Sequence, residues 1–224
     1  MRTYFYYFFL ILLPSFVIGQ NIKGALVGGI NATQVDGDEV YGYHKIGFNA
    51  GAIAIVPFTK NFSVSIETSY SQKGSNQKAR FADSIHNGEY KLILDYVEVP
   101  VLFHYSDKDL IKVGTGFSWG KLVNFKEWEN SGRVNWSTPN GPYKRSDVDV
   151  LIDLQIKLFT GFHLDIRYMY SVGKLRTRTF QYPLGAPFTR KQFNNDLAFR
   201  LIYIFKDSKT IKEKKKTDTN KIKK

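Results

Sequence analysis

The alternation of residues 195–205 (NDLAFRLIYIF) constrains the fold more than any other feature of the sequence. One face of this segment is apolar and the other carries charge: Leu197, Phe199, Leu201, Tyr203 and Phe205 share the first, and Asp196 and Arg200 share the second. A strand of this kind is typical of a closed barrel in lipid, where hydrogen bonds between strands satisfy every backbone group. We therefore predict that residues 195–205 are the closing strand of a transmembrane β-barrel.

Seven further segments alternate in the same way or run apolar between turn residues, most clearly residues 148–158, whose even positions are all aliphatic. They are residues 22–34, 46–56, 62–70, 90–105, 111–119, 148–158 and 162–170. Short connections at residues 57–61, 106–109 and 160–161 alternate with long ones at residues 35–45, 73–88, 123–147 and 174–191. The sequence therefore predicts an all-β fold, an eight-stranded antiparallel up-and-down transmembrane β-barrel, with its short turns and both termini in the periplasm and its long loops outside.

Residues 90–105 change the parity of their apolar positions. Tyr90, Leu92, Leu94 and Tyr96 are even, whereas Val97, Val99, Val101 and Phe103 are odd. A β-bulge near Asp95 would bring both sets to the same face. Alternatively, the upper half of the segment projects beyond the bilayer. The sequence is compatible with both arrangements.

The two ends of the chain differ from the barrel in composition. Residues 1–19 carry Arg2, an apolar run before Pro14 and a small residue at Gly19, which predicts a signal peptide for export. Residues 206–224 hold nine lysines and three acidic residues, and so supply +6 of the net charge of +12. We expect a disordered, lysine-rich periplasmic tail there and a single barrel domain over residues 20–205. Because the tail lacks aromatic residues that could stack on bases, nucleic acid is not an expected partner.

Two absences narrow the class of protein further. The chain has no cysteine, which excludes disulfides and thiolate chemistry. The apolar run before Pro14 is too short to span a bilayer as a helix, and no other stretch approaches the length that a transmembrane helix needs. A helical membrane protein is therefore not expected.

The polar faces of the predicted strands collect ionisable side chains of both signs. They are Glu67, Glu98, Lys112, Asp149, Asp153, Lys157, Asp165, Arg167, Asp196 and Arg200. The lumen of an eight-stranded barrel is just wide enough for side chains to fill, so we expect these charges to pair with one another and to close it. This structural network is favoured over a conducting pore and over a relay of protons or solutes.

The sequence contains no evident catalytic, cofactor or metal site. The four histidines are spread over different elements, and no pair of them has metal-ligand spacing. A lipid-modifying enzyme would need a serine, a histidine and an acid near one rim of the barrel. His44 and His86 are candidates only by their loop positions, and no nucleophile motif accompanies them. We therefore expect no enzymatic activity.

Two loop features remain as candidates for binding. The acidic run at residues 36–39 (DGDE) lacks the spaced ligands of a calcium loop, and an exposed turn is expected there. Trp128 and Trp136 lie in the longest predicted loop, whereas most other aromatic residues lie at strand ends, where an aromatic girdle belongs. Either these two tryptophans stack on a sugar or contact a partner, or they pack locally within the loop.

Three motifs in this order carry a resemblance to a known family: DGDEVYGYHKIGFNAG (residues 36–51), SYSQKGS (69–75) and YKLILDYVEVPVL (90–102). The chain resembles the PorT-like outer-membrane β-barrel family, also called the porin family or outer membrane protein β-barrel domain. The resemblance covers residues 20–205 and implies an eight-stranded outer-membrane barrel of a Gram-negative bacterium. One namesake belongs to a protein secretion and gliding apparatus. The lysine-rich tail and the tryptophan-bearing loop depart from the family pattern.

The leading hypothesis is a non-enzymatic integral outer-membrane barrel that contacts lipid and displays loops outward. It could also serve as an accessory component of a secretion or envelope assembly, with protein partners there. One alternative is a soluble lipocalin-like barrel with its apolar residues around a ligand, although the charges between the aliphatic residues disfavour such an interior. The other alternative is a lipid-modifying outer-membrane enzyme.

Overall fold

The computed structural model describes residues 22–79, 88–108, 110–130, 132–136, 141–181 and 185–205, which form one antiparallel sheet. Its strands are β1 (Lys23–Asp36), β2 (Lys45–Pro57), β3 (Phe62–Gln77), β4 (Tyr90–Asp107), β5 (Ile111–Glu129), β6 (Gly132–Arg133), β7 (Ser146–Phe159), β8 (Phe162–Ser171), β9 (Arg176–Phe180) and β10 (Phe188–Ile204). The expected signal peptide at residues 1–19 and the expected tail at residues 206–224 lie outside the described residues.

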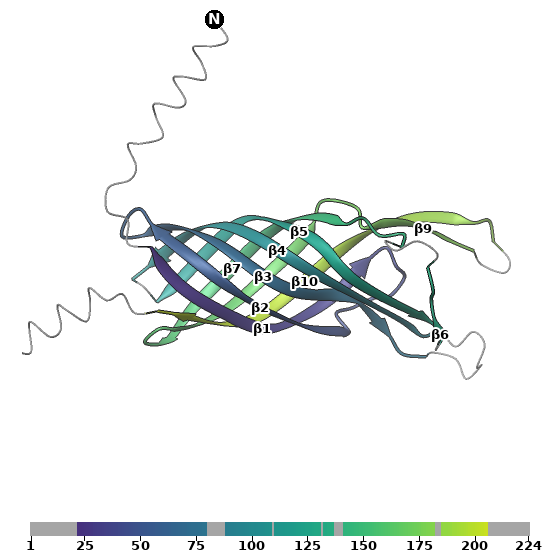
Figure 1. The fold of residues 1–224 in the computed structure, drawn as a ribbon, viewed down its shortest axis with the longest axis horizontal. Helices are drawn as coiled ribbons and strands as arrows, with labels where there is room; N and C mark the ends of the chain where they lie inside the picture. Colours follow the sequence, from purple (N-terminus) through teal and green to yellow (C-terminus); the bar gives the residue numbers. More distant parts are fainter. Residues whose placement is uncertain are drawn as a thin grey trace, which may run out of the picture.

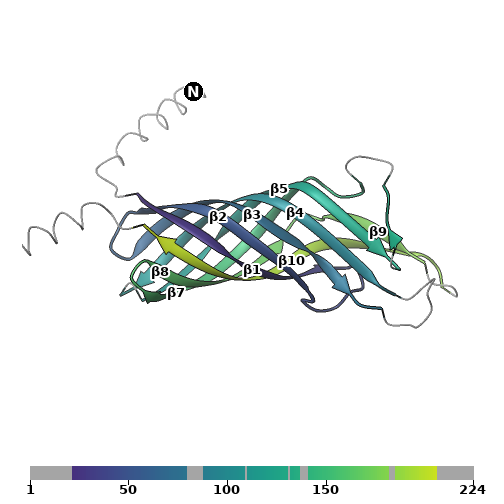
Figure 2. The same cartoon turned by 60° about the horizontal axis from the view of Figure 1, so that its bottom comes forward.

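Eight of the described strands form a closed ring. Neighbours pair in the order β1-β2-β3-β4-β5-β7-β8-β10, and β10 pairs back with β1 from Ala25↔Ile204 to Asp36↔Phe193. Figures 1 and 2 show the resulting barrel of tilted strands from two sides. A closed ring leaves no unpaired sheet edge along its wall, the condition under which strands can span lipid. The predicted eight-stranded antiparallel up-and-down barrel is confirmed.

The connections divide the barrel into two ends, which we call the turn end and the loop end. The short turns β2–β3, β4–β5 and β7–β8 gather at the turn end, on the left of Figure 1, together with the start of β1 and the end of β10. The four longer connections gather at the loop end on the right, where β6 and β9 also lie. The alternation of short and long connections therefore matches the prediction.

Outward side chains form an apolar belt around the barrel. Ile152 is 56% exposed and Leu201 is 44% exposed, whereas Asp153 and Arg167 are each 1% exposed. The predicted orientation, with the aliphatic face outside and the charged face inside, is confirmed. This orientation does not favour the alternative of a soluble lipocalin-like barrel, which needs the reverse. Among the described residues, no helix is long and apolar enough to cross a membrane.

Aromatic side chains border this belt on both sides. Near the turn end, the ring centroids of Phe62 and Phe103 lie 5.4 Å apart and those of Phe162 and Tyr203 lie 4.7 Å apart. Toward the loop end, Phe48 and Tyr70 lie 5.2 Å apart, Tyr170 and Phe193 lie 6.4 Å apart, and Trp119 is exposed. From Tyr203 to Phe193, β10 rises by about 25 Å along the axis of a barrel with the usual strand tilt, which is the height of a membrane-spanning band.

The strands extend farther toward the loop end than the sequence predicts. β3 continues to Gln77, β5 continues to Glu129 and β10 begins at Phe188. β9 pairs with the start of β10, and β6 pairs with the end of β5. Because these extensions lie beyond the belt, they lack the regular outward apolar residues on which the prediction depended, and the sequence alone assigns them to loops.

The parity change in β4 arises from its passage beyond the belt. Even-numbered residues of β4 face inward along the whole strand, so that Leu92 and Leu94 are buried in the loop-end half of the barrel. The ladder between β4 and β5 does shift register at Asp95, where a bulge was predicted. The additional residue, however, is Val123 of β5. The second of the two arrangements is thus correct: the loop-end half of β4 projects beyond the lipid.

Substitution of Ile152 by arginine tests the belt. We expect Ile152→Arg to lower the free energy of unfolding by about 2–4 kcal/mol, because the charge would lie near the middle of the bilayer. Val172→Arg is the matched control: Val172 is 59% exposed, but it lies beyond the end of β8. It should cost no more than about 1 kcal/mol. Denaturant unfolding in lipid vesicles measures both values, and equal costs would contradict a lipid-facing belt.

Candidate functional site

The middle of the lumen holds a group of ion pairs that we call the arginine cluster: Glu67, Asp153, Asp165, Arg167 and Arg200. All five side chains are buried. Glu67 bridges the two guanidinium groups, at 2.7 Å from Arg200 Nη1 and 3.1 Å from Arg167 Nη1. Asp165 accepts a hydrogen bond of 2.7 Å from Arg200 Nε, and Asp153 lies 3.4 Å from Arg167 Nη2. The cluster therefore links β3 to β7, β8 and β10 across the lumen.

Strand register accounts for two of the four arginine–carboxylate pairs in the arginine cluster. Arg200 lies directly opposite Asp165, and Arg167 lies directly opposite Asp153, on neighbouring strands. Opposite charges at such cross-strand positions are close enough to pair. His104 of β4 extends the cluster, with its Nε2 3.1 Å from Asp153 Oδ2. It has room because β5 carries Gly114 there, where a Cβ atom would lie 2.2 Å from Asp153 Oδ1 and 2.4 Å from the imidazole ring.

Closer to the loop end lies a second group, the lysine cluster: Lys73, Glu98, Asp149 and Asp196. The Lys73 ammonium lies 2.8 Å from Glu98, 2.7 Å from Asp149 and 3.2 Å from Asp196, and all four side chains are buried. Its nitrogen also lies 5.3 Å from the centroid of the Tyr96 ring. One cation thus contacts three carboxyl groups that come from three different strands.

Eight of the ten charged residues that the sequence predicts inside the barrel are buried and belong to these clusters. They are Glu67, Glu98, Asp149, Asp153, Asp165, Arg167, Asp196 and Arg200. Lys112 is half-buried near the turn end, and Lys157 is exposed there and belongs to neither cluster. Lys157 lies just before the β7–β8 turn, at a register shift of the ladder, where water replaces the lumen.

Sequence reasoning misses Lys73 because the apolar signal of β3 ends at Tyr70. The signal that could have found it is on the other face. Ser65, Glu67, Ser69 and Ser71 continue the inward parity as far as Lys73. In this strand, the polar face alone marks where the strand runs beyond the belt.

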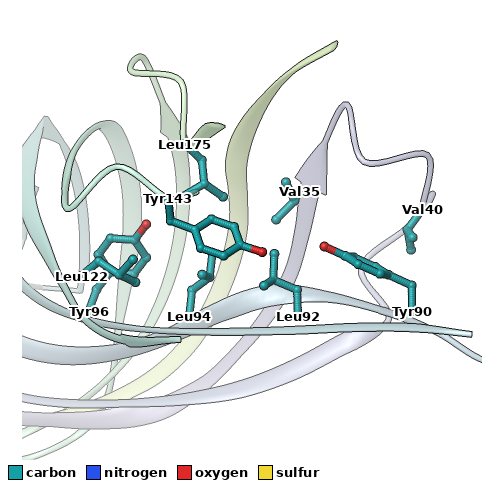
Figure 3. Packing of buried hydrophobic residues seen from close by; sticks show 9 residues of the cluster. All are labelled: Val35, Val40, Tyr90, Leu92, Leu94, Tyr96, Leu122, Tyr143 and Leu175. Carbon is teal, nitrogen blue, oxygen red and sulfur yellow. The ribbon is translucent and has the colours of Figure 1, made fainter. Parts of the chain in front are cut away.

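The loop end of the barrel holds a cluster of buried apolar and aromatic side chains, which we call the loop-end core. It contains Val35, Val40, Tyr90, Leu92, Leu94, Tyr96, Leu122, Tyr143 and Leu175. Figure 3 shows these side chains converging from β1, β4, β5 and the connections between strands. The loop-end core is a hydrophobic surface that faces inward, in contrast to the belt, which faces outward.

Arg176 of β9 fastens the connection between β8 and β10 over this core. Its guanidinium group lies 2.8 Å from Glu127 Oε1, donates a hydrogen bond of 2.9 Å to the Tyr90 hydroxyl, and lies 4.6 Å from the Tyr143 ring centroid. Burial disfavours the charged form of Arg176, but the adjacent tyrosines and Glu127 outweigh this effect and raise its pKa above the usual value. We call these contacts the Arg176 clamp. The only sequence signal for it is the short alternation of residues 176–180 (RTRTF).

The acidic run at residues 36–39 is not the exposed turn that the sequence predicts. Asp38 is 4% exposed and accepts a hydrogen bond of 2.8 Å from the Val40 backbone N–H. Gly37, with a φ of 88°, turns the chain so that Val40 joins the loop-end core. Burial raises the pKa of Asp38 to about 6. Hydrophobic packing of Val40 therefore draws the neighbouring carboxyl group out of water.

Of the two tryptophans that the sequence places in the longest loop, Trp128 lies within β5 and Trp136 follows β6. The Trp136 indole N–H donates a hydrogen bond of 3.0 Å to Glu127 Oε2, and its side chain lines a pocket of about 320 Å³. Trp128 is half-buried, and the Lys91 ammonium lies 5.4 Å from the centroid of its ring. Trp136 borders a pocket, and Trp128 packs against the neighbouring strand.

The three histidines that the structure describes lie on different elements. His104 is paired with Asp153 in the lumen, His163 is buried, and His44 is exposed at the loop end. His86 lies outside the described residues. In the part of the chain that the structure describes, no three His, Cys, Asp or Glu side chains are grouped so that they could hold a metal ion.

A closed ring with an outward apolar belt and an ion-paired interior defines an integral membrane β-barrel. Residues 20–176, more than half of the sequence, match the family described as outer membrane protein beta-barrel domain. The chain belongs to this family. It is therefore a protein of the outer membrane, with its belt in contact with lipid.

Several solved outer-membrane barrels are similar to this chain. For Ail, the attachment invasion locus protein of Yersinia pestis, the TM-score is 0.47 at 16% identity, over 82% of this chain and 98% of that chain. For Neisserial surface protein A the values are 0.48, 11%, 84% and 100%, and for OprG from Pseudomonas aeruginosa they are 0.41, 9%, 84% and 98%. At these identities the likeness concerns the fold alone. No curated protein matches the chain.

Removal of the single cation in the lysine cluster tests how strongly the barrel depends on it. We expect Lys73→Met to lower the free energy of unfolding by about 3–5 kcal/mol, because three buried carboxylates lose their counter-charge. Lys157→Met, at an exposed position, should change it by less than about 0.5 kcal/mol. Adding Asp149→Asn to Lys73→Met should restore part of the loss. Tryptophan-monitored unfolding in vesicles gives these values, and equal stability of the two lysine variants would disprove the dependence.

Proposed function

We propose that this protein is a closed, non-enzymatic outer-membrane barrel that presents its loop end to the outside of the cell. The observation that carries the proposal is that side chains occupy successive levels of the lumen. Above a small apolar cluster near the turn end, which includes Val27 and Ile202, come the arginine cluster, the lysine cluster and the loop-end core. A polar solute would have to break buried ion pairs in order to pass.

The role that we propose for the charged clusters is structural. Each cation of the arginine cluster contacts two carboxylates, and the Lys73 ammonium contacts three. Ions held by several partners at once are costly to displace, because each partner would be left buried without its counter-charge. This argument favours a filled lumen over a solute or proton relay.

The absence of enzymatic activity is part of the proposal, and its support is the position of the histidines. His104 and His163 point into the lumen, away from the lipid where a lipid-modifying enzyme would find its substrate. His44 is at the loop end, but no hydrogen bond between its ring and a serine or a carboxylate is found among the described residues. A nucleophile activated by a base needs such a contact.

The same proposal includes export by a signal peptide at residues 1–19 and a lysine-rich tail in the periplasm. Two facts support it: the match to the barrel family begins at residue 20, and both ends of the described chain lie at the turn end. Short turns on the periplasmic side and long loops outside are the usual arrangement of outer-membrane barrels.

We also propose a PorT-like relationship and an accessory role in a secretion or envelope assembly, with protein partners there. The support is the resemblance of the three sequence motifs, whose residues meet in space at the loop end. Val40 of the first motif and Leu92 and Leu94 of the third pack in the loop-end core, and Lys73 of the second lies below them. Each of the three motifs thus contributes at least one buried residue at or just below the mouth.

Conductance measurements test whether the lumen is closed. We expect the protein, reconstituted in planar bilayers, to give no discrete conductance steps, because paired side chains fill its interior. A larger porin with a water-filled channel is the positive control. Reproducible steps that scale with the salt concentration would refute the closed lumen, whatever the loops bind.

Site-specific labelling tests the orientation of the barrel. The chain has no native cysteine, so single cysteines can be introduced at Lys78, at the loop end, and at Lys60, in the β2–β3 turn. Both side chains are exposed. On intact cells, a maleimide attached to a bulky polymer should modify Lys78→Cys and spare Lys60→Cys, and both should react after lysis. Labelling of Lys60→Cys alone on intact cells would reverse the orientation.

A further inference from the structure

We propose that the pocket beside β5 at the loop end binds an anionic saccharide, that is, a sugar carrying carboxylate or phosphate groups. This inference deepens the proposed function, because it depends on the loop end facing outside. It does not depend on whether the lumen conducts ions.

The pocket exists because β5 loses its partner β7 above the belt. β5 pairs with β7 as far as Lys121↔Ser146, and its pairing with β6 begins only at Trp128↔Arg133. Between these ladders, two backbone hydrogen bonds hold the chain: Leu122 N–H to the Arg145 carbonyl, at 2.7 Å, and Val134 N–H to the Glu127 carbonyl, at 2.9 Å. The extra residue Val123 bends the strand in this gap. The resulting pocket of about 320 Å³ lies at the small end of the range for small-molecule sites.

The charges that line this pocket favour an anion. Lys126, Arg133 and Arg145 line it, and all three are exposed. Glu127 is the single acid among its described lining residues. The Glu127 carboxylate already receives the Arg176 guanidinium at 2.8 Å and hydrogen bonds from the Tyr90 hydroxyl and the Trp136 indole. The acid is thus neutralised from within the barrel, and the basic groups determine the potential of the pocket.

The surrounding surface has the same sign. Among the described residues of the loop end, every acidic residue is buried or half-buried. Besides the three bases of the pocket, the exposed basic residues at this end are Lys78, Lys91, Lys121, Lys144, Arg190 and Lys191. A surface with one sign of exposed charge raises the local concentration of oppositely charged ligands.

Trp136 and two amides favour a sugar over a bare anion. The hydrogen bond to Glu127 fixes the edge of the Trp136 ring, while the side chain remains 41% exposed. An oriented aromatic surface with a polar tip suits the apolar face of a pyranose. Asn124 and Asn135 also line the pocket. Asn124 donates one hydrogen bond of 2.7 Å to Asp95, and its remaining amide groups and those of Asn135 can pair with hydroxyl groups. Inorganic phosphate would use the charges but not these groups.

Titration calorimetry with the full-length protein in detergent tests the proposal. The probes are trigalacturonate, which is anionic, maltotriose, which is neutral, and inorganic phosphate. We expect trigalacturonate to bind at least about tenfold more tightly than either of the others, and Arg133→Gln to weaken its binding about tenfold, which corresponds to about 1.4 kcal/mol. Trp136→Ala should weaken trigalacturonate without changing the response to phosphate.

Arg190→Gln is the matched control, because it removes an exposed arginine of the loop end that does not line the pocket. Its affinity for trigalacturonate should equal that of the wild type. Equal weakening by Arg190→Gln and Arg133→Gln would overturn the proposal in favour of a diffuse charge effect, as would equal binding of maltotriose. Heat-modifiable migration on gels establishes that each variant is folded.

The anionic sugar could come from a soluble polysaccharide or from the lipopolysaccharide of the same membrane. Repeating the titration in nanodiscs with and without lipopolysaccharide distinguishes these sources. Competition by lipopolysaccharide identifies a lipid-linked sugar as the occupant, and unchanged affinity identifies a soluble one. Discrete conductance steps in the bilayer experiment would refute the closed lumen without affecting either result, so the two proposals fail separately.

Discussion

The pairing of charges across a narrow, closed lumen is the interaction on which the rest of this barrel depends. Closure of the sheet sends every second side chain inward, and in a ring of eight strands those side chains must fill the space themselves. An ion without a partner there would lose its hydration and gain no ion pair to compensate for it. Glu67 supplies the decisive contact, because it joins Arg167 and Arg200, which are not adjacent to it in the sheet. Hydrogen bonds between neighbouring strands and ion pairs across the lumen thus stabilise the same ring.

The lysine cluster has fewer counter-charges for its buried carboxylates than the arginine cluster. Three carboxylates depend on Lys73, whose strand carries it past the belt toward the loop end. The loop-end core then separates the cluster from the solvent beyond. Its apolar side chains do not face lipid, so the barrel has two hydrophobic surfaces, one outward around the middle and one inward at the mouth. β4 contributes to both without changing its parity, because its lower half lies in the belt and its upper half lies above it.

The sequence predicts the parts of this architecture that lie within the lipid-facing belt and misses the parts that lie beyond it. Wherever a strand crosses the belt, the requirement for outward apolar residues produces a period of two, and the eight strands and most interior charges follow from it. Above the belt this requirement ends. The sequence therefore assigns Lys73, Glu127 and Arg176 to polar loops, although they lie in strands. The bulge at Val123 leaves no signal in the sequence, because it shifts the register of a segment that faces solvent on one side.

The loop end segregates its charges by sign, and closure of the mouth is the cause. Asp38 and Glu127 are drawn inward, one beside Val40 of the loop-end core and the other by the Arg176 clamp. Each acid that is buried at the mouth is absent from the surface, whereas Lys126 and Arg133 remain exposed on long, flexible side chains. Because its acids are buried or half-buried, the loop end consequently presents a positive exterior. The groups that pack at the mouth therefore also set the charge of the surface on which the proposed saccharide site lies.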